Sequence, residues 1–164
     1  MKKIFLLLNG DNHPAVATSY SYIGQIYFAQ NDYSKALDYF KKSLKIVLSV
    51  YGENHSQVSS IYDHIGEIYF AQKDYSKALY YFEESLKIRL SLFGENHPEV
   101  ALSYYSIGSL YIIQGDKSKA LNYYEKSLKI RLSVYGENHP LTKEIMDLIN
   151  VANSKVLQSP ETTK

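Results

Sequence analysis

The chain contains no cysteine, no tryptophan and only 4 prolines among its 164 residues. Without cysteine there is no disulfide, no thiolate metal ligand and no cysteine nucleophile. Long hydrophobic runs are also missing. The apolar run at residues 4–8 is short, and no stretch approaches the ~18–20 apolar residues of a membrane-spanning helix. The sequence therefore predicts no contact with a membrane.

Charge of one sign is not in excess, since 18 basic residues face 17 acidic ones. Such a balance gives no general attraction to nucleic acid or to an anionic surface. Catalytic patterns are lacking as well: there is no Gly-x-Ser-x-Gly, no His-Glu-x-x-His and no phosphate-binding glycine loop. We expect no enzyme, no catalytic residue, no cofactor and no metal.

What the chain does contain is an internal repeat. Gly10, Gly52, Gly94 and Gly136 each begin the string Gly-(Asp/Glu)-Asn-His, at equal intervals of 42 residues. A fixed period of ~20–50 residues is typical of stacked repeat arrays. Three full copies follow one another.

Each copy reads as two amphipathic helices joined by a short polar turn. In the third copy the apolar residues recur at steps of three and four, which is the spacing of one helix face; they are Val100, Tyr104, Ile107, Leu110 and Tyr111, then Ala120, Leu121, Tyr124, Leu128 and Leu132. Gly115-Asp116 separates the two segments. Gly108, like Gly24 and Gly66, lies inside the first helix, where glycine costs about 1 kcal/mol relative to alanine. Its repetition predicts close approach of the second helix.

Tyr104, Ile107-Gly108, Tyr111, Ala120 and Tyr124, with their counterparts in the other copies, resemble the tetratricopeptide repeat. Serine (Ser43, Ser85, Ser127) replaces the family's next alanine. The long second helix and its linker resemble the kinesin-light-chain variety. The resemblance implies an all-α fold, namely a right-handed α-solenoid of stacked antiparallel helix pairs with a C-terminal capping helix.

We expect one domain over residues 1–157. It divides into a helix stub (1–9), three repeats (10–51, 52–93 and 94–135) and a capping helix (136–157), followed by a disordered tail (158–164). Residues 1–8 could instead be a signal peptide, but the apolar run is shorter than such a segment needs. Their alignment with the end of a second helix is the better interpretation.

Histidines and cations both have structural interpretations. His13, His55, His97 and His139 lie one per linker, a full repeat apart, so we do not expect a metal site. The second helices carry lysines and both arginines, which predicts a solvated outer face; among these residues are Lys41, Lys42, Lys45, Lys87, Arg89, Lys129 and Arg131.

The resemblance also implies where a ligand would bind. In tetratricopeptide arrays the first helices line a concave groove that holds a peptide. Helical spacing around the inward glycine gives the groove positions, which are Ser21, Gln25 and Phe28 beside Tyr22; Asp63, Glu67 and Phe70 beside His64; and Tyr105, Ser109 and Ile112 beside Ser106. These positions differ among the copies. They lack the Asn-Asn pair and the basic clamp that the resemblance would bring.

We therefore expect a non-enzymatic, cytoplasmic protein-interaction module, a scaffold or adaptor. Its groove would prefer a neutral to basic, partly apolar peptide, with Asp63 and Glu67 supplying negative charge and Phe28, Phe70 and Ile112 an apolar floor. A solvated helix face at Asp63 and Glu67 is an equally good interpretation. Two alternatives stay open: weak head-to-tail self-association through the N-terminal stub, or a spacer segment within a larger signalling or transport adaptor.

Overall fold

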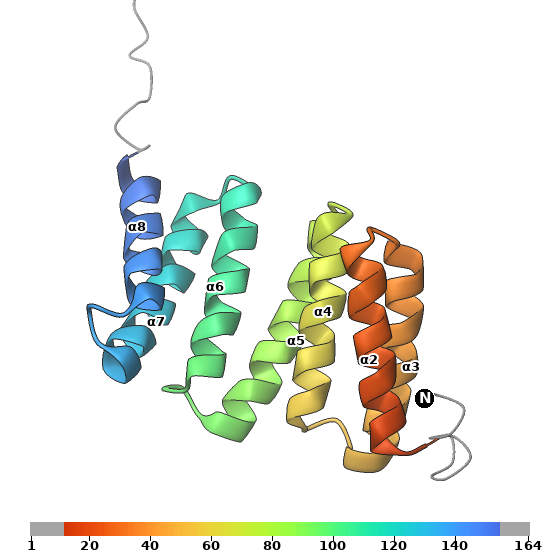
Figure 1. Ribbon diagram of the computed structural model, residues 1–164. Helices are drawn as coiled ribbons and strands as arrows, with labels where there is room; N and C mark the ends of the chain where they lie inside the picture. Colours follow the sequence, from red (N-terminus) through yellow and green to blue (C-terminus); the bar gives the residue numbers. More distant parts are fainter. Residues whose placement is uncertain (1–11, 155–164) are drawn as a thin grey trace, which may run out of the picture. The chain divides into compact units, whose positions relative to one another are not determined.

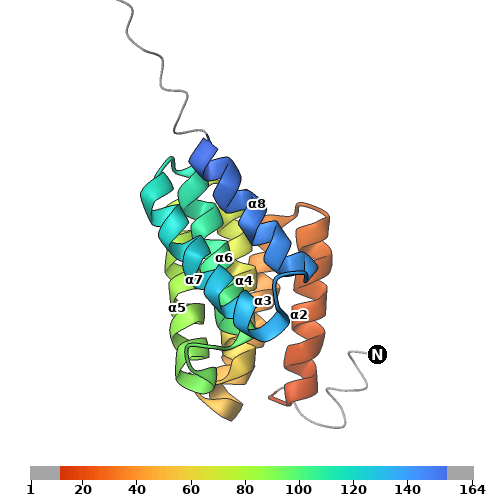
Figure 2. The same ribbon diagram turned by 90° about the vertical axis from the view of Figure 1, so that its left-hand side faces the viewer.

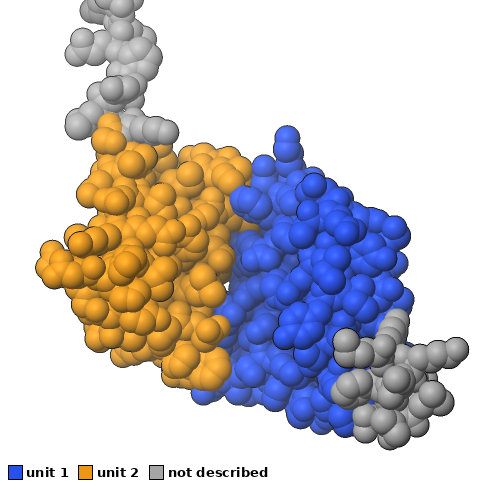
Figure 3. All heavy atoms as spheres, viewed as in Figure 1, with its two compact units in different colours: residues 1–92 blue, residues 93–164 orange. Residues whose placement is uncertain are grey.

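The computed structural model describes residues 12–154, and every regular element in that range is a helix (Figure 1). This confirms the all-α class. The chain divides into two compact units, Met1–Leu92 and Phe93–Lys164 (Figure 3), which are described separately below as unit 1 and unit 2. The helices are α2 (Pro14–Ala29), α3 (Tyr33–Tyr51), α4 (Ser56–Ala71) and α5 (Tyr75–Phe93), then α6 (Pro98–Ile113), α7 (Lys117–Tyr135) and α8 (Pro140–Ser154).

Antiparallel pairs form where the sequence repeats: α2 with α3, α4 with α5, and α6 with α7 (Figure 1). The interior glycine of each first helix faces an aromatic ring of the second. A Cβ added to Gly24 would lie 3.0 Å from the Phe40 ring, and one added to Gly66 would lie 2.7 Å from the Phe82 ring. Both distances are shorter than ordinary van der Waals contact, and at Gly66 a side chain would overlap the ring, which confirms the predicted close approach.

The linker histidines have a structural role that the chain repeats. His55 Nδ1 accepts a hydrogen bond from the Gln57 backbone N–H at 3.2 Å and so caps the start of α4. Its ring stacks on Tyr51, the last residue of α3, at 4.2 Å between centroids. Gly52 between them adopts a φ of +79°, which favours glycine. His97 and His139 make the same cap and the same stacking contact, on Phe93 and Tyr135.

The turn inside each pair also follows the prediction. Asp32 caps α3 by accepting a hydrogen bond from the Lys35 backbone N–H at 3.2 Å, and Asp116 caps α7 in the same way through Lys119 at 3.1 Å. The preceding residue in each turn has a positive φ, which Gly115 adopts without strain. A polar turn followed by an aspartate therefore ends one helix and starts the next.

In unit 2, α8 packs against α7, as both ribbon views show (Figure 1, Figure 2). Its buried residues are Thr142, Ile145 and Ala152. Leu141 is 41% exposed, whereas Thr142 is fully buried. The reason is register, because Thr142 occupies the place that Val58 and Val100 occupy in earlier first helices.

Some expectations lie outside the described residues: the stub at 1–9, the end of the capping helix at 155–157 and the tail at 158–164. The single domain over 1–157 stays a prediction. In the described range no helix is long and apolar enough to cross a membrane.

Candidate functional site

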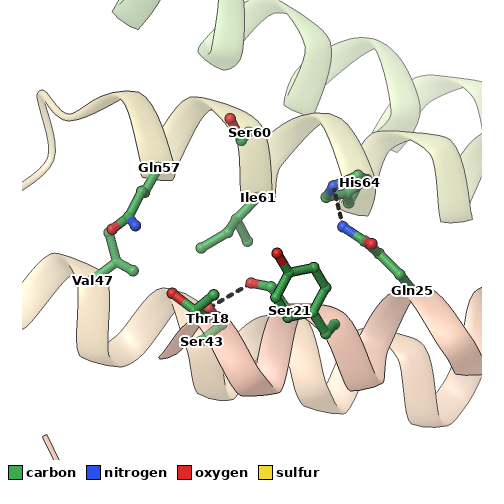
Figure 4. A pocket seen from close by; sticks show the side chains of 10 residues that line it. Thr18, Ser21, Gln25, Ser43, Val47, Gln57, Ser60, Ile61 and His64 are labelled. Atoms are coloured by element: carbon green, nitrogen blue, oxygen red, sulfur yellow. Dashed lines mark hydrogen bonds between the residues drawn. The ribbon is translucent and has the colours of Figure 1, made fainter. Parts of the chain in front are cut away.

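A pocket of about 200 Å³ opens in unit 1 among α2, α3 and α4, and we call it the α2–α4 pocket. Side chains from the three helices point toward one another around it (Figure 4). Its lining is uncharged apart from the ionisable ring of His64, and mixes hydroxyls and amides with apolar groups; it consists of Thr18, Ser21, Tyr22, Gln25, Ser43, Val47, Gln57, Ser60, Ile61 and His64. Four predicted groove residues, Ser21, Tyr22, Gln25 and His64, therefore meet at one site.

Small side chains keep the α2–α4 pocket open at its base. The Ser43 hydroxyl donates to the Ala17 carbonyl at 2.8 Å, so the Ser21 hydroxyl is the donor in the 2.8 Å bond between Ser21 and Ser43. Val47 forms the wall beside them and is buried. The equivalents of Ser21 and Val47 are Asp63 and Arg89 in the second repeat, and Tyr105 and Arg131 in the third.

His64 forms one edge of the pocket and is held on both ring nitrogens. Gln25 Nε2 lies 3.2 Å from His64 Nε2, and His64 Nδ1 lies 3.2 Å from Glu67 Oε2. Both contacts are satisfied together when the proton is on Nδ1, because Nε2 then accepts from the Gln25 amide. The imidazole also stacks on Phe40 at 5.0 Å between centroids. The polar edge of the pocket is thus preorganised.

Gln57 supplies a hydrogen-bond acceptor that the described part of the protein leaves unused. Its Oε1 atom is buried and has no partner there. A buried polar atom without a partner costs about 1–3 kcal/mol relative to a satisfied one. The same side chain lines the α2–α4 pocket.

Asp63 does not present the free negative charge that we expected. Its carboxylate lies 2.6 Å from Arg89 Nη2, and the two side chains are 20% and 4% exposed. Burial raises the pKa of Asp63, while the Arg89 guanidinium acts in the opposite direction. Glu67, by contrast, is 51% exposed and contacts His64, so it is the predicted acid that carries charge at the edge of this face.

The prediction that both arginines lie on a solvated outer face is wrong. Arg89 and Arg131 are 3% and 4% exposed. In unit 2, Arg131 donates to the Leu141 carbonyl and reaches Glu144 at 3.3 Å, and its guanidinium lies over the Tyr105 ring at 5.1 Å. Both arginines follow the buried stripe of the second helix instead of its lysine-rich side.

The three residues of the predicted apolar floor do not line one pocket. Phe28 packs beside Tyr33 of its own repeat and Phe70 beside Tyr75, at 5.9 and 5.8 Å between centroids. Neither ring lines the α2–α4 pocket. Ile112 instead lines a hollow of about 190 Å³ in unit 2 with Tyr124 and residues of α8.

The remaining predicted residues lie in unit 2. The Tyr105 hydroxyl donates to Glu144 at 3.2 Å, and Ser109 shares a 3.2 Å hydrogen bond with the Tyr124 hydroxyl. Burial, then the nearby Glu144 carboxylate, raises the pKa of Tyr105. Ser106 is partly buried. One groove shared by all three repeats stays a prediction, because such a groove would span both units.

Sequence reasoning missed the pocket residues on α3 and at the start of α4, above all Val47 and Gln57. A signal existed for Val47, which replaces the arginine of the other two copies. No signal marked Gln57. Within residues 12–154 no three side chains of the kinds that bind metals converge.

Comparison with known proteins bears on the fold and the family. The family model described as tetratricopeptide repeat matches residues 3–49, 35–91 and 57–133. No curated protein matches the chain.

Solved structures are similar at low sequence identity. BtubC (BKLC) from P. vanneervenii is 20% identical, with 93% of this chain and 69% of that one covered and a TM-score of 0.72. The nearly identical TPR-like repeats of a putative kinesin light chain from Podosopora anserina are 15% identical, with 96% and 84% covered and a TM-score of 0.70. The N-terminal domain of stress-induced protein-1 from C. elegans is 16% identical, with 85% and 96% covered and a TM-score of 0.63. With the repeat model matching most of the sequence, the chain belongs to the tetratricopeptide repeat family.

Proposed function

We propose that unit 1 binds a peptide segment of a partner protein across α2 and α4, with one uncharged side chain of that peptide in the α2–α4 pocket. Tetratricopeptide repeats generally mediate protein–protein interactions. The observation that carries the proposal is a difference between repeats at two positions. Ser21 and Val47 leave a hollow in the first repeat, whereas the Asp63–Arg89 ion pair takes the equivalent positions in the second.

The lining favours a neutral side chain that can both donate and accept hydrogen bonds. Serine hydroxyls and the amide of Gln25 offer polar contacts, and Gln57 Oε1 has no partner in the described part of the protein. Val47 and Ile61 offer apolar contact for the stem. An asparagine or glutamine side chain combines these requirements. A charged head group would lose its hydration without a counter-ion.

Residues beside the pocket would contact the rest of the peptide. Tyr22 is 63% exposed next to it, and an exposed tyrosine is a frequent binding anchor. Glu67, at the far side of His64, favours a basic residue on the peptide. An exposed charge pair of this kind contributes about 0.2–1 kcal/mol, so we expect the preference to be modest.

The test is selection from a random peptide library displayed on phage, followed by titration of the enriched peptides. Ser21→Asp combined with Val47→Arg copies the pair that the second repeat already accommodates and should fill the pocket. We expect it to weaken binding about tenfold or more, as loss of a central contact does. Lys41→Glu, which changes an exposed charge on α3, is the matched control and should have no effect. No enrichment, or equal binding by wild type and the double variant, would rule the proposal out.

A further inference from the structure

A second hollow in unit 1, of about 430 Å³, lies between the α3–α4 linker, α4 and α5. Its walls include two tyrosines, Tyr62 and Tyr80, and two carboxylates, Glu53 and Glu84. We call it the Tyr62–Tyr80 pocket. Tyr62 is two residues from both Ser60 and His64, which is roughly 200° around the helix. The pocket therefore opens on the other side of α4 from the α2–α4 pocket.

In the third repeat a lysine of the chain itself lies over the tyrosines equivalent to Tyr62 and Tyr81, and in the first repeat a lysine lies over the equivalent of Tyr81. In the third repeat Lys126 Nζ lies 5.5 Å from the centroid of the Tyr104 ring and 5.3 Å from that of Tyr123. In the first repeat Lys42 Nζ lies 4.8 Å from the centroid of the Tyr39 ring. An ammonium group within ~6 Å of a tyrosine face is attracted by the ring electrons. The repeat thus has a built-in place for an ammonium group over its tyrosines.

The second repeat keeps the tyrosines and removes the lysine. Tyr62 and Tyr81 lie 5.6 Å apart, much as Tyr104 and Tyr123 lie 6.0 Å apart. The residue equivalent to Lys42 and Lys126 is Glu84. Within residues 12–154 no cation lies over the ring of Tyr62 or Tyr80. The tyrosines that a lysine of the chain contacts in the third repeat therefore lack that lysine in the second repeat.

Two further changes in the second repeat favour a cation from outside. Tyr80 stands where the other copies have Asp38 and Asn122; it is 57% exposed and packs edge-on against Tyr81 at 5.2 Å. It therefore extends the aromatic wall toward solvent.

The formal charge of the pocket also favours a cation. Glu53 and Glu84 against Lys87 give the pocket a formal charge of −1, whereas the equivalents Glu95, Lys126 and Lys129 give +1. Lys87 Nζ forms a long ion pair with Glu84 at 3.9 Å, but its side chain is 78% exposed, so water screens this pair and the net formal charge of the pocket remains −1. Burial raises the pKa of Tyr62, and the carboxylates of Glu84 and Glu53 raise it further, so both carboxylates lie close enough to act on this ring.

We propose that the Tyr62–Tyr80 pocket binds the ammonium group of a lysine side chain, methylated or not, on a partner protein. The tyrosine faces contact the ammonium group, and Glu53 and Glu84 neutralise its charge. Lysine is the occupant because Lys126 lies over the equivalent tyrosines in the third repeat, and Lys42 lies over Tyr39, the equivalent of Tyr81, in the first. This site is independent of the peptide-binding face on α2 and α4.

The test is titration of the protein with three small probes, followed by NMR of backbone amides. The probes are Nα-acetyl-lysine amide, its Nε-trimethyl form and the uncharged Nα-acetyl-norleucine amide. We expect the two cationic probes to shift amides of the linker at 53–54 and of the Tyr80–Lys87 segment of α5. Norleucine should leave them unchanged. Equal binding by norleucine would overturn the proposal, and so would binding of tetramethylammonium without binding of either lysine probe.

Two substitutions borrowed from the other repeats locate the site. Glu84→Lys should weaken the lysine probe about tenfold by supplying the internal ammonium group, and Tyr80→Asn about threefold by removing an exposed aromatic contact. Circular-dichroism melting checks that both variants remain folded. The reciprocal variant, Asn122→Tyr with Lys126→Glu, should create a second lysine site in unit 2. Unchanged affinity in Glu84→Lys would overturn the proposal, whereas Ser21→Asp/Val47→Arg should leave the probe's affinity as it is.

Discussion

The two units build the same two positions of the repeat in different ways. In unit 1 the first repeat has Ser21 and Val47, and a pocket opens between its helices. In unit 2 the third repeat has Tyr105 and Arg131, and the guanidinium lies over the tyrosine ring and reaches Glu144 of α8. Around these positions the packing is the same, with glycine against an aromatic ring in both units.

This difference separates what holds the fold from what shapes its surface. Gly24 against Phe40 in unit 1 and Gly108 against Tyr124 in unit 2 fix the distance between paired helices. The residues at positions 21 and 47, and their equivalents, determine whether the space between pairs is open or occupied. Because the second set can change without disturbing the first, one repeat can present a pocket while another presents an ion pair.

The largest expected effect comes from breaking the buried pair in the second repeat. Arg89→Val should lower the free energy of unfolding by about 3–5 kcal/mol, because it leaves the buried Asp63 carboxylate without its partner. Burial raises the pKa of Asp63, and Arg89 is the neighbour that lowers it most. Without it Asp63 binds a proton more tightly in the folded state, so the loss should shrink as the pH falls.

Urea unfolding of Arg89→Val, Asp63→Ser and the double variant measures this coupling. The double variant copies the Ser21–Val47 pair of the first repeat, and we expect it to recover most of the stability. A double variant as unstable as Arg89→Val alone would show that the two positions do not exchange as a pair.

A smaller effect should distinguish the glycines of the two units. A Cβ on Gly108 would lie 2.7 Å from the Tyr124 ring and 3.3 Å from the Ala120 carbonyl oxygen, whereas one on Gly24 would lie no closer than 3.0 Å to the Phe40 ring. Tyr124 is held by its bond to Ser109. Overpacking costs about 1–3 kcal/mol, and alanine returns about 1 kcal/mol of helix propensity. Gly108→Ala should therefore lose about 1–2 kcal/mol, and Gly24→Ala close to none.

Urea unfolding of the two single variants decides this point. Ser109→Ala serves as the control, since it releases the Tyr124 hydroxyl and should lessen the cost of Gly108→Ala. A larger loss in Gly24→Ala than in Gly108→Ala would contradict the close approach at Gly108.

Much of the fold was predictable because each structural feature occurs three times. Gly24, Gly66 and Gly108 indicate the tight contacts, and the polar turn at Gly115-Asp116 indicates where one helix ends and the next begins. A residue that recurs at the same position of three successive repeats is not a chance occurrence, so one sequence is enough to identify it as structural. The capping and stacking of the linker histidines could not be predicted, because both depend on how the linker folds back on the preceding helix.

The candidate site was predictable only in part. Arg89 was assigned to the lysine-rich face by its charge, yet it continues the buried stripe of Ala78, Phe82 and Ser85 at helical spacing. Its burial depends on Asp63 from the neighbouring helix, and that pairing cannot be seen in one helix alone. The prediction for Arg89 follows its charge, whereas the helical spacing of the buried residues of α5 gives its true position.

The smallest expected effect concerns the helix starts, where the units should not differ. Asp32 and Asp116 each contact the lysine three residues later through its backbone N–H and its ammonium group. These bonds hold the pKa of both carboxyls below the ordinary value of 3.8; the Lys35 side chain contributes most at Asp32 and the Lys119 backbone N–H most at Asp116. A carboxyl with a lowered folded pKa stabilises the fold above its unfolded pKa, and that stability is lost as the pH falls through the folded pKa.

Thermal melting of Asp32→Asn and Asp116→Asn, at pH values on both sides of 3.8, tests this. Asparagine keeps the capping acceptor and removes the charge. Each variant should melt slightly below wild type at neutral pH, and the gap should close at low pH, to the same extent in both units. Equal gaps would show that both units share the same helix cap. The residues at positions 21 and 47, by contrast, differ from their equivalents in unit 2. A gap that persists at low pH, or that occurs in one unit only, would mean that the helix starts also vary between the units.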